Sequence, residues 1–219
     1  MILNALCIIT LLLVVALVTA EIKLAPRARY VLKPLASIGF LATALQAGAL
    51  DGASSYGLWI FAGLVLSFWG DVFLMADERP ALFLAGLGSF LLGHVAYVVA
   101  FISFGVDVKL TALSGVALLP VAWFVWRWLR PHLPKDMLVP VIAYVGVICA
   151  MVAHALGAWG AGGTVLMPIG ATLFWISDLA VARRQFVDPS PTNAIWGLPL
   201  YYGGQLVLAV SVTSTLPGS

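Results

Sequence analysis

The apolar runs of this chain are long enough to cross a lipid bilayer, and they recur along the whole sequence. A membrane-spanning helix needs about 20 mostly apolar residues. Of the 219 residues, 63% are hydrophobic and only 9% are charged, whereas about a quarter of the residues in an ordinary soluble domain are charged. Long unbroken runs also differ from the short alternating segments of a membrane β-barrel. The sequence therefore predicts an all-α, polytopic transmembrane bundle that forms a single domain over residues 1–219.

The hydropathy pattern predicts about eight spans. They cover Ile2–Ala20, Pro34–Leu50, Tyr56–Ala76, Ala81–Phe104, Leu110–Leu129, Met137–Ala158, Thr164–Ala182 and Ala194–Thr213. The first span could instead be a leader cleaved after Val18-Thr19-Ala20. No basic residue precedes its apolar run, and the run is long for a leader, which favours a retained helix.

Basic residues orient the bundle, because cytoplasmic loops of membrane proteins collect Lys and Arg. The odd-numbered connections and their flanks hold almost all of them: Lys23, Arg27, Arg29, Lys33, Arg79, Arg127, Arg130, Lys135, Arg183 and Arg184. The even-numbered connections hold only Lys109. We therefore expect an integral, multi-pass protein with both termini outside, in the inner (cytoplasmic) membrane if the source is bacterial. The net charge of +2 is too small to indicate a nucleic-acid partner.

Two acidic residues lie inside apolar runs. Asp71 lies in Leu66–Met75 (LSFWGDVFLM), and Asp178 lies in Leu173–Val181 (LFWISDLAV). A charge at membrane depth costs at least about 2.5–3.5 kcal/mol, so such an acid faces a cavity, has a partner and marks a functional site. At 1.5 Å per residue, each acid lies roughly 7 Å from the cytoplasmic end of its helix. The sequence thus predicts one polar pocket at a common depth.

The surroundings of the two acids resemble each other. Phe68–Asp71 (FWGD) is similar to Phe174–Asp178 (FWISD), and a helix with polar aromatic residues follows each hairpin turn. Four helices separate the two segments, so they run in the same direction. The pattern suggests two parallel four-helix halves that bring the acids to one interface, an arrangement known from repeat-built membrane proteins.

Further polar residues fall on the returning helices. Tyr201, Tyr202 and Gln205 enter the membrane from the same side as the acids, while His94 and Tyr97 lie deeper. The acids could instead form a purely structural pair with the tyrosines, Gln205 or an arginine. His94 could equally be a hydrogen-bonded packing residue.

Several site chemistries have no sequence support. No HxxxH or similar zinc-ligand spacing, GxSxG elbow, phosphate-binding loop or dinucleotide fingerprint is present. Asp71, His94 and Asp178 could in principle supply three metal ligands, but the spacing does not favour a metal. We expect neither a metal nor a cofactor.

The ordered motifs resemble those of the YhhN-type lysoplasmalogenase family. The residues that carry the resemblance are Lys33-Pro34, Gly70-Asp71 followed by VFLM, Gly93-His94 with Tyr97, Ser177-Asp178, and Tyr201-Tyr202 with Gln205. The resemblance implies a membrane hydrolase that cleaves the vinyl ether bond of lysoplasmalogens without a metal. Its products would be a fatty aldehyde and a glycerophospho-alcohol carrying ethanolamine or choline. It also implies that Asp71 and Asp178 are the catalytic pair.

This chemistry suits two carboxyl groups. A vinyl ether is hydrolysed by protonation of its β-carbon, and water then captures the oxocarbenium ion. One carboxyl group can donate the proton while the other stabilises the cation or activates water, as in glycoside hydrolysis. From the sequence we assign the acid role to Asp71, because the arginines behind Asp178 favour its ionised form. The expected substrate-binding residues are Lys33, His94, Tyr97, Ser177, Arg184, Tyr201, Tyr202 and Gln205.

Other functions fit the same features. Paired intramembrane acids also serve proton-coupled transporters of small or lipid-like substrates. A metal-dependent lipid amidase is a second alternative, and a purely structural membrane protein is a third. The expected partners of the hydrolase are a lysophospholipid substrate and the bilayer, and the sequence leaves the oligomeric state open.

Overall fold

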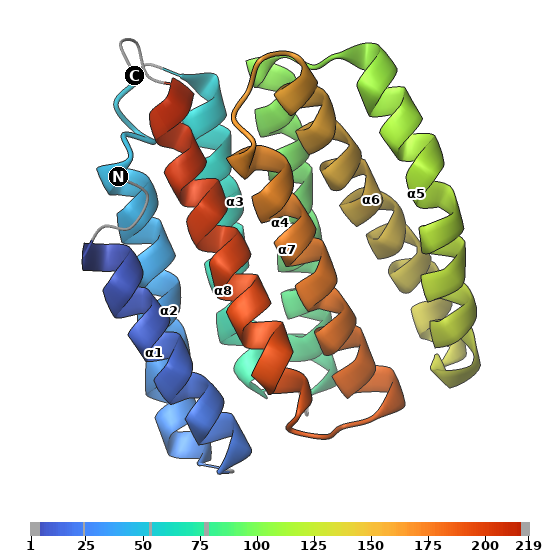
Figure 1. The fold of residues 1–219 in the computed structure, drawn as a ribbon. Helices are drawn as coiled ribbons and strands as arrows, with labels where there is room; N and C mark the ends of the chain where they lie inside the picture. Colours follow the sequence, from blue (N-terminus) through green and yellow to red (C-terminus); the bar gives the residue numbers. More distant parts are fainter. Residues whose placement is uncertain (1–4, 24, 53, 77–78, 216–219) are drawn as a thin grey trace.

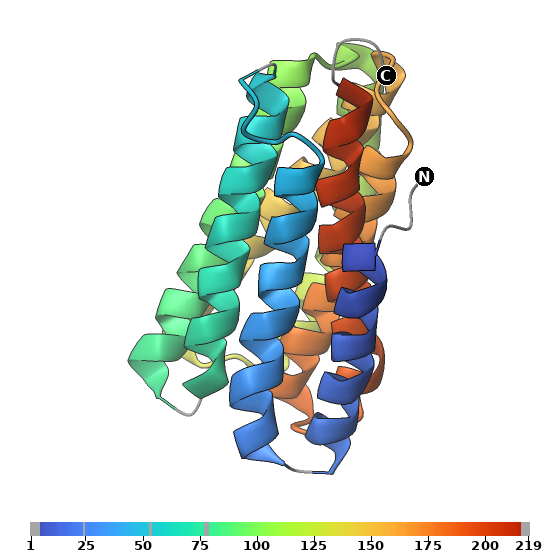
Figure 2. The same ribbon diagram turned by 90° about the vertical axis from the view of Figure 1, so that its left-hand side faces the viewer.

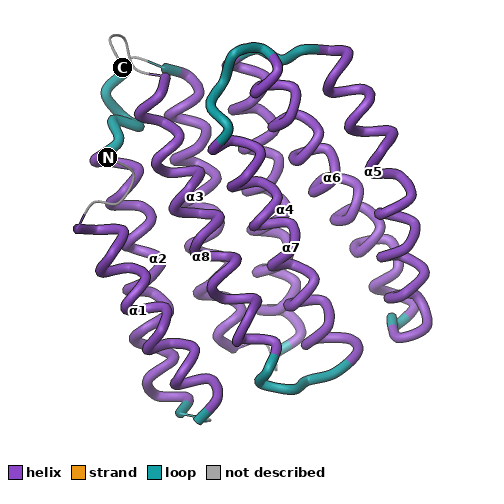
Figure 3. Tube along the Cα trace, viewed as in Figure 1, coloured by secondary structure: helices purple, strands orange, loops and turns teal. Residues whose placement is uncertain are grey.

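The computed structural model describes residues 5–23, 25–52, 54–76 and 79–215. Over these residues the chain is helical with short connections and has no strand (Figure 3). The α-helices are α1 (Ala5–Ile22), α2 (Pro26–Gln46), α3 (Ser55–Phe73), α4 (Pro80–Phe104), α5 (Val108–Leu129), α6 (Leu138–Gly160), α7 (Leu166–Ala182) and α8 (Asn193–Ser211). This confirms the predicted all-α bundle of about eight helices.

Successive helices run up and down along one common direction (Figures 1 and 2). The connections that follow α1, α3, α5 and α7 therefore lie together at one end, the lower end in Figure 1. These connections contain Lys23, Arg79, Lys135 and Arg183. We call this end the basic end of the bundle.

The helix contacts repeat between the two halves of the chain. In each half, consecutive helices pack against each other, and the halves meet where α2 contacts α8 and α4 contacts α6. These two contacts are equivalent when α1–α4 is matched with α5–α8, as two parallel four-helix halves require. The match fails at the first helix of each half, since α1 packs on both α2 and α8, whereas α5 packs mainly on α6 at the outer edge (Figure 1).

Six of the described helices are long and apolar enough to cross a membrane, which makes the chain a multi-pass membrane protein. The exceptions, α2 and α8, carry many of the polar residues singled out from the sequence. α2 begins at Pro26, two turns before the predicted start at Pro34, with proline in its first turn. The basic residues Arg27 and Arg29 are therefore helical, which hydropathy alone does not indicate.

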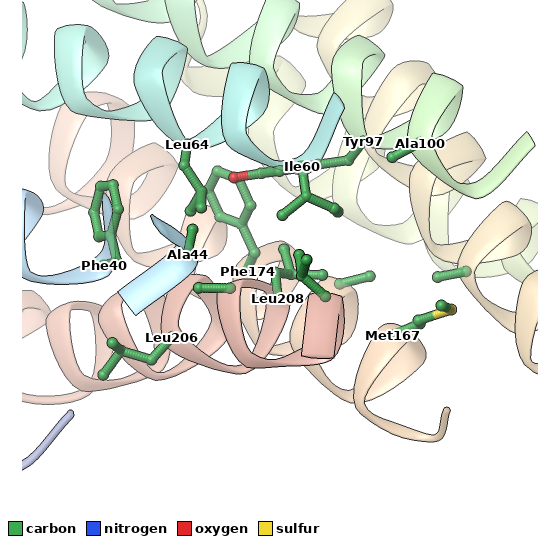
Figure 4. Packing of buried hydrophobic residues seen from close by; sticks show 14 of the residues in the cluster. Phe40, Ala44, Ile60, Leu64, Tyr97, Ala100, Met167, Phe174, Leu206 and Leu208 are labelled. Carbon is green, nitrogen blue, oxygen red and sulfur yellow. The ribbon is translucent and has the colours of Figure 1, made fainter. Parts of the chain in front are cut away.

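The main core is built by α1, α2, α3, α4, α6, α7 and α8, and apolar and aromatic side chains fill it (Figure 4). The Phe174 ring of α7 lies 6.2 Å from the Tyr97 ring of α4. Tyr97 in turn covers Gly63 of α3, where a Cβ atom would run into the ring. Small residues allow such close helix packing in membranes. This packing fixes the relative positions of the helices that carry the two acids.

Candidate active site

The two membrane-embedded acids lie at the basic end of the bundle. Asp71 is in the last turn of α3, and Asp178 is one turn before the end of α7. Both line one cleft, which we call the polar cleft. Its lining includes Glu21, Lys33, Asp71, Ser177, Asp178, Arg184, Asn193 and Tyr201.

Hydrogen-bond donors and a cation surround the carboxyl group of Asp71. The hydroxyl groups of Ser37 and Tyr201 each donate to Oδ2 at 2.7 Å. The Nζ atom of Lys33 lies 3.2 Å from Oδ1, and the Asp71 side chain is only 3% exposed. A buried carboxylate is tolerated when it is paired with a cation and hydrogen-bonded. These contacts therefore favour the ionised form of Asp71.

Hydrogen bonds continue from this group away from the basic end. Tyr97 donates to Oε1 of Gln205 at 2.6 Å, and Nε2 of Gln205 donates to the Ser67 hydroxyl at 3.2 Å. All three side chains are buried. Tyr97 and Gln205, which the sequence suggested as substrate-binding residues, thus tie α8 to α3 and α4 and do not line the polar cleft.

Asp178 has different surroundings. The hydroxyl group of Tyr144 on α6 donates to Oδ2 at 2.8 Å. The Nε2 atom of His94 on α4 lies 3.4 Å from the same oxygen, and the Asp178 side chain is 15% exposed. The His94 ring also stacks on Phe174, with 4.3 Å between the ring centroids. The charged or chargeable neighbour of Asp178 is therefore an imidazole ring, whereas that of Asp71 is an ammonium group.

The hydrogen bond between His94 and Phe90 indicates which ring nitrogen of His94 carries hydrogen. Nδ1 lies 2.6 Å from the carbonyl oxygen of Phe90, which can only accept, so Nδ1 carries hydrogen. Among the described residues, Nε2 has no hydrogen-bond partner. A neutral ring would then present the Nε2 lone pair to a carboxylate oxygen, which is repulsive in a buried site. One further proton on the pair would remove this repulsion, either as imidazolium and carboxylate or as imidazole and carboxylic acid.

Asp178 also borders an apolar pocket between α4, α5, α6 and α7. The pocket is lined by residues such as Phe83, Leu87, Val125, Val141, Tyr144, Trp175 and Phe186. Phe90, Asp178 and Val181 line both this apolar pocket and the polar cleft. Asp178 thus lies at the junction of the polar cleft and the apolar pocket, whereas Asp71 lines the polar cleft and not the apolar pocket.

The contacts around the acids follow the repeat of the two halves. Three pairs of residues are each separated by 107 positions: Ser37 and Tyr144, Asp71 and Asp178, and His94 and Tyr201. Each acid accepts a hydroxyl hydrogen bond from its own half, from Ser37 or from Tyr144. The other half supplies Tyr201 to Asp71 and His94 to Asp178. The two halves therefore complete each other's site.

The remaining expected binding residues lie on or beside the polar cleft. Lys33, Ser177 and Arg184 line it. Tyr202 lies behind it, where its hydroxyl group is 3.1 Å from that of Ser37 and donates to the Lys33 carbonyl at 3.2 Å. Arg183 instead donates to Asn193 and pairs with Asp188, which fixes the connection between α7 and α8.

Sequence reasoning missed Ser37 and Tyr144, which donate to the two acids. A serine and a tyrosine in apolar helices are common, and nothing in their immediate neighbourhood marks them. The only available signal was the 107-residue separation, which becomes informative once the two acids are aligned. Within the described residues, no group of three or more His, Cys, Asp or Glu side chains is placed to hold a metal.

Comparisons with known proteins agree on one family. The model of the YhhN family matches residues 28–212. The chain is 29% identical over 167 residues to Lysoplasmalogenase TMEM86B of Sus scrofa, which covers 76% of this chain and 69% of the relative. It is 31% identical over 162 residues to Lysoplasmalogenase TMEM86B of Homo sapiens, covering 74% and 66%.

A bacterial relative is similar over a shorter region. The chain is 31% identical over 135 residues to Lysoplasmalogenase of Mycobacterium tuberculosis, covering 59% of this chain and 50% of the relative. The chain thus spans from half to about two-thirds of the length of these relatives. No solved structure matches it significantly.

Proposed function

The chain belongs to the YhhN family, and from this premise we propose that it is a membrane-embedded hydrolase that cleaves the vinyl ether bond of lysoplasmalogens. Water is added across the bond, and the products are a fatty aldehyde and a glycerophospho-alcohol. Three of the relatives in this family are named lysoplasmalogenase. The observation that carries the proposal to this chain is the position of Asp178 between the polar cleft and the apolar pocket.

That position suits the substrate, because the vinyl ether bond joins the polar glycerol to the hydrocarbon chain. With the headgroup in the polar cleft and the alkenyl chain in the apolar pocket, the scissile bond lies beside Asp178. Lys33 and Arg184 line the cleft and supply positive charge for the phosphate. A ligand site with one charged and one apolar compartment fits an amphiphile better than a small polar solute.

The two acids divide the chemistry. The pair of Asp178 and His94 holds the proton that is donated to the β-carbon of the vinyl ether. Asp71, ionised beside Lys33, stabilises the oxocarbenium ion and accepts a proton from the attacking water. The hemiacetal then collapses: Asp71 returns its proton to the glycerol oxygen as the C–O bond breaks, and the hydroxyl proton of the hemiacetal restores the pair of Asp178 and His94, which leaves aldehyde and alcohol. The contacts therefore favour Asp178 as the acid, the reverse of the assignment made from the sequence.

The experiment is aldehyde release from a 1-alkenyl lysophosphoethanolamine by purified protein in detergent. We expect Asp71→Asn and Asp178→Asn each to lower kcat by about 10²–10⁴-fold. Asp51→Asn is the matched control, because Asp51 is exposed and lies in the connection between α2 and α3, away from the basic end. The corresponding 1-acyl lysolipid, an ester, should not be cleaved, and a chelator should leave the rate unchanged.

Folded wild-type protein that releases no aldehyde would overturn the proposal, and so would full activity in either Asp variant. Loss of activity with chelator, restored by added metal, would instead support the metal-dependent alternative.

We further propose that the basic end faces the cytoplasm and that both termini lie outside. The support is the concentration of Lys and Arg in the connections at that end. A reporter enzyme fused after Ser219 should then be active outside the cytoplasm. A cytoplasmic signal from that reporter would reverse the orientation.

A further inference from the structure

A second, more open cleft adjoins the polar cleft at the basic end. It lies among the ends of α1 and α2 and the connection between α7 and α8, and Glu21, Arg184 and Ala194 line both clefts. The open cleft continues past these residues to Arg29, Pro189 and Pro191. A molecule bound beside Asp178 can therefore extend through the polar cleft toward Glu21.

Glu21 and Arg29 form a loose ion pair in this open cleft. The Oε1 atom of Glu21 lies 3.9 Å from Nε of Arg29, which is too long for a hydrogen bond. Arg29 uses its terminal nitrogen to donate to the carbonyl oxygen of Met75. Among the described residues, its buried Nε has no hydrogen-bond partner, and none donates a hydrogen bond to the Glu21 carboxylate in the structure. The Glu21 carboxylate, whose side chain is 15% exposed, therefore retains hydrogen-bonding capacity toward the cleft.

The charges of the two clefts match a zwitterionic headgroup. The polar cleft presents the cations of Lys33 and Arg184, and the carboxylate of Glu21 lines both this cleft and the open cleft, which does not include Asp178. A lysophosphoethanolamine presents a phosphate near its ether bond and an ammonium group farther from it. Charge complementarity of this kind fixes the orientation of a ligand more than its total affinity.

We propose that Glu21 binds the ammonium group of an ethanolamine headgroup and selects it over headgroups without a hydrogen-bonding cation. This inference rests on the proposed function, because it takes the substrate from there. None of the described residues that line the open cleft is aromatic. A quaternary choline group is usually held by an aromatic cage, while a primary ammonium can donate hydrogen bonds directly to a carboxylate. The cleft therefore favours ethanolamine over choline.

The position of Glu21 separates headgroup selection from the chemistry. Glu21 lies near the end of α1, before residue 28, where the match to the family model begins. The two acids, by contrast, lie on α3 and α7 within the matched region. Replacing Glu21 should then change which headgroup is preferred and leave the cleavage step intact.

The test compares wild type with Glu21→Gln on three alkenyl substrates that differ only in the headgroup: phosphoethanolamine, phosphocholine and a bare phosphate monoester. We expect Glu21→Gln to lower kcat/KM for the ethanolamine substrate roughly tenfold, which is the size of one charge-assisted hydrogen bond. The decrease in kcat/KM should be smaller for the choline substrate. For the phosphate substrate, which has no cation, kcat/KM should stay the same or increase. Asp136→Asn is the matched control, since Asp136 is an exposed acid at the same end of the bundle, and it should change none of the three.

The outcomes separate three explanations. An equal loss on all three substrates would mean that Glu21 only positions Arg29 or α1, and it would overturn the proposal. Unchanged kcat/KM on all three would overturn it as well, and so would a loss with choline as large as that with ethanolamine. Absence of aldehyde from every substrate with folded wild-type protein would instead be a failure of the proposed function itself.

Discussion

Asp71 and Asp178 occupy equivalent positions in the two halves of the chain, yet their surroundings differ. Asp71 accepts two hydroxyl hydrogen bonds and pairs with the ammonium group of Lys33. Asp178 accepts one hydroxyl hydrogen bond, faces an imidazole nitrogen and borders an apolar pocket. The first carboxyl group thus has three donors, one of them a cation, whereas the second has one hydroxyl donor and a histidine nitrogen 3.4 Å away.

The difference arises at positions that the repeat makes equivalent. The residue 107 positions after Lys33 is Pro140, so the second half has no counterpart of the ammonium group. Tyr201 contacts Asp71 where His94, its equivalent, contacts Asp178. A repeated scaffold thus places two similar carboxyl groups at one cleft, and a few sequence differences give them different surroundings.

The largest effect is expected from removal of the cation beside Asp71. Lys33→Met leaves a buried carboxylate without its partner, which costs about 3–5 kcal/mol of stability. The double variant Lys33→Met with Asp71→Asn should recover much of this loss, because no buried charge then remains. Thermal and denaturant unfolding of the protein in detergent measure both variants. Lys109→Met is the control, because Lys109 is exposed at the opposite end of the bundle. A Lys33→Met protein as stable as wild type would mean that Asp71 does not depend on a cation in the way proposed.

The next effect separates the two equivalent partners of the acids. His94→Gln removes the group that shares the proton with Asp178 and should lower kcat about 10²-fold or more. Tyr201→Phe leaves Asp71 with Lys33 and Ser37 and should cost at most about tenfold. Steady-state aldehyde release by the two variants gives the ratio of their kcat values. Equal losses would mean that the two carboxyl groups are not differentiated as proposed.

A smaller effect should come from the apolar pocket, which only Asp178 borders. Ala122 of α5 lines this pocket, so Ala122→Leu should raise KM for a long-chain alkenyl substrate roughly tenfold relative to a short-chain one. Ala117→Leu makes the same change on an exposed face of α5 and serves as the control. The measurement is KM for a series of alkenyl substrates of increasing chain length. If Ala122→Leu changed KM equally for all of them, the alkenyl chain would not bind in this pocket.

The smallest effects concern the two equivalent hydroxyl donors. Ser37→Ala and Tyr144→Phe each remove one hydrogen bond to a carboxyl group, which should cost about 1 kcal/mol of stability. Tyr144→Phe should additionally lower kcat, because it acts on the acid that holds the proton. Ser103→Ala, outside both sites, controls for loss of a helix-surface hydroxyl group. Unfolding midpoints and rates, measured side by side, would show whether only one of the two donors affects catalysis.

Much of the fold was predictable from the sequence, since long apolar runs leave few alternatives to membrane helices. Helix boundaries beside charged residues were not predictable from hydropathy. For example, α2 begins at Pro26 and includes the charged residues that follow it. The two acids stood out as charged residues in apolar surroundings. Their hydroxyl donors did not, because Ser37 and Tyr144 are unremarkable within their own segments.

Composition and hydropathy were enough to indicate the class of protein, a count of about eight helices and two acidic residues that need an explanation at membrane depth. An acidic residue within an apolar segment is identified by its neighbours in the sequence alone. The tertiary structure alone decided the partners of each acid, since Lys33 and Tyr201, which meet at Asp71, come from opposite ends of the chain. Such contacts depend on how the two halves pack together. That packing places a cation beside one carboxyl group and an imidazole beside the other.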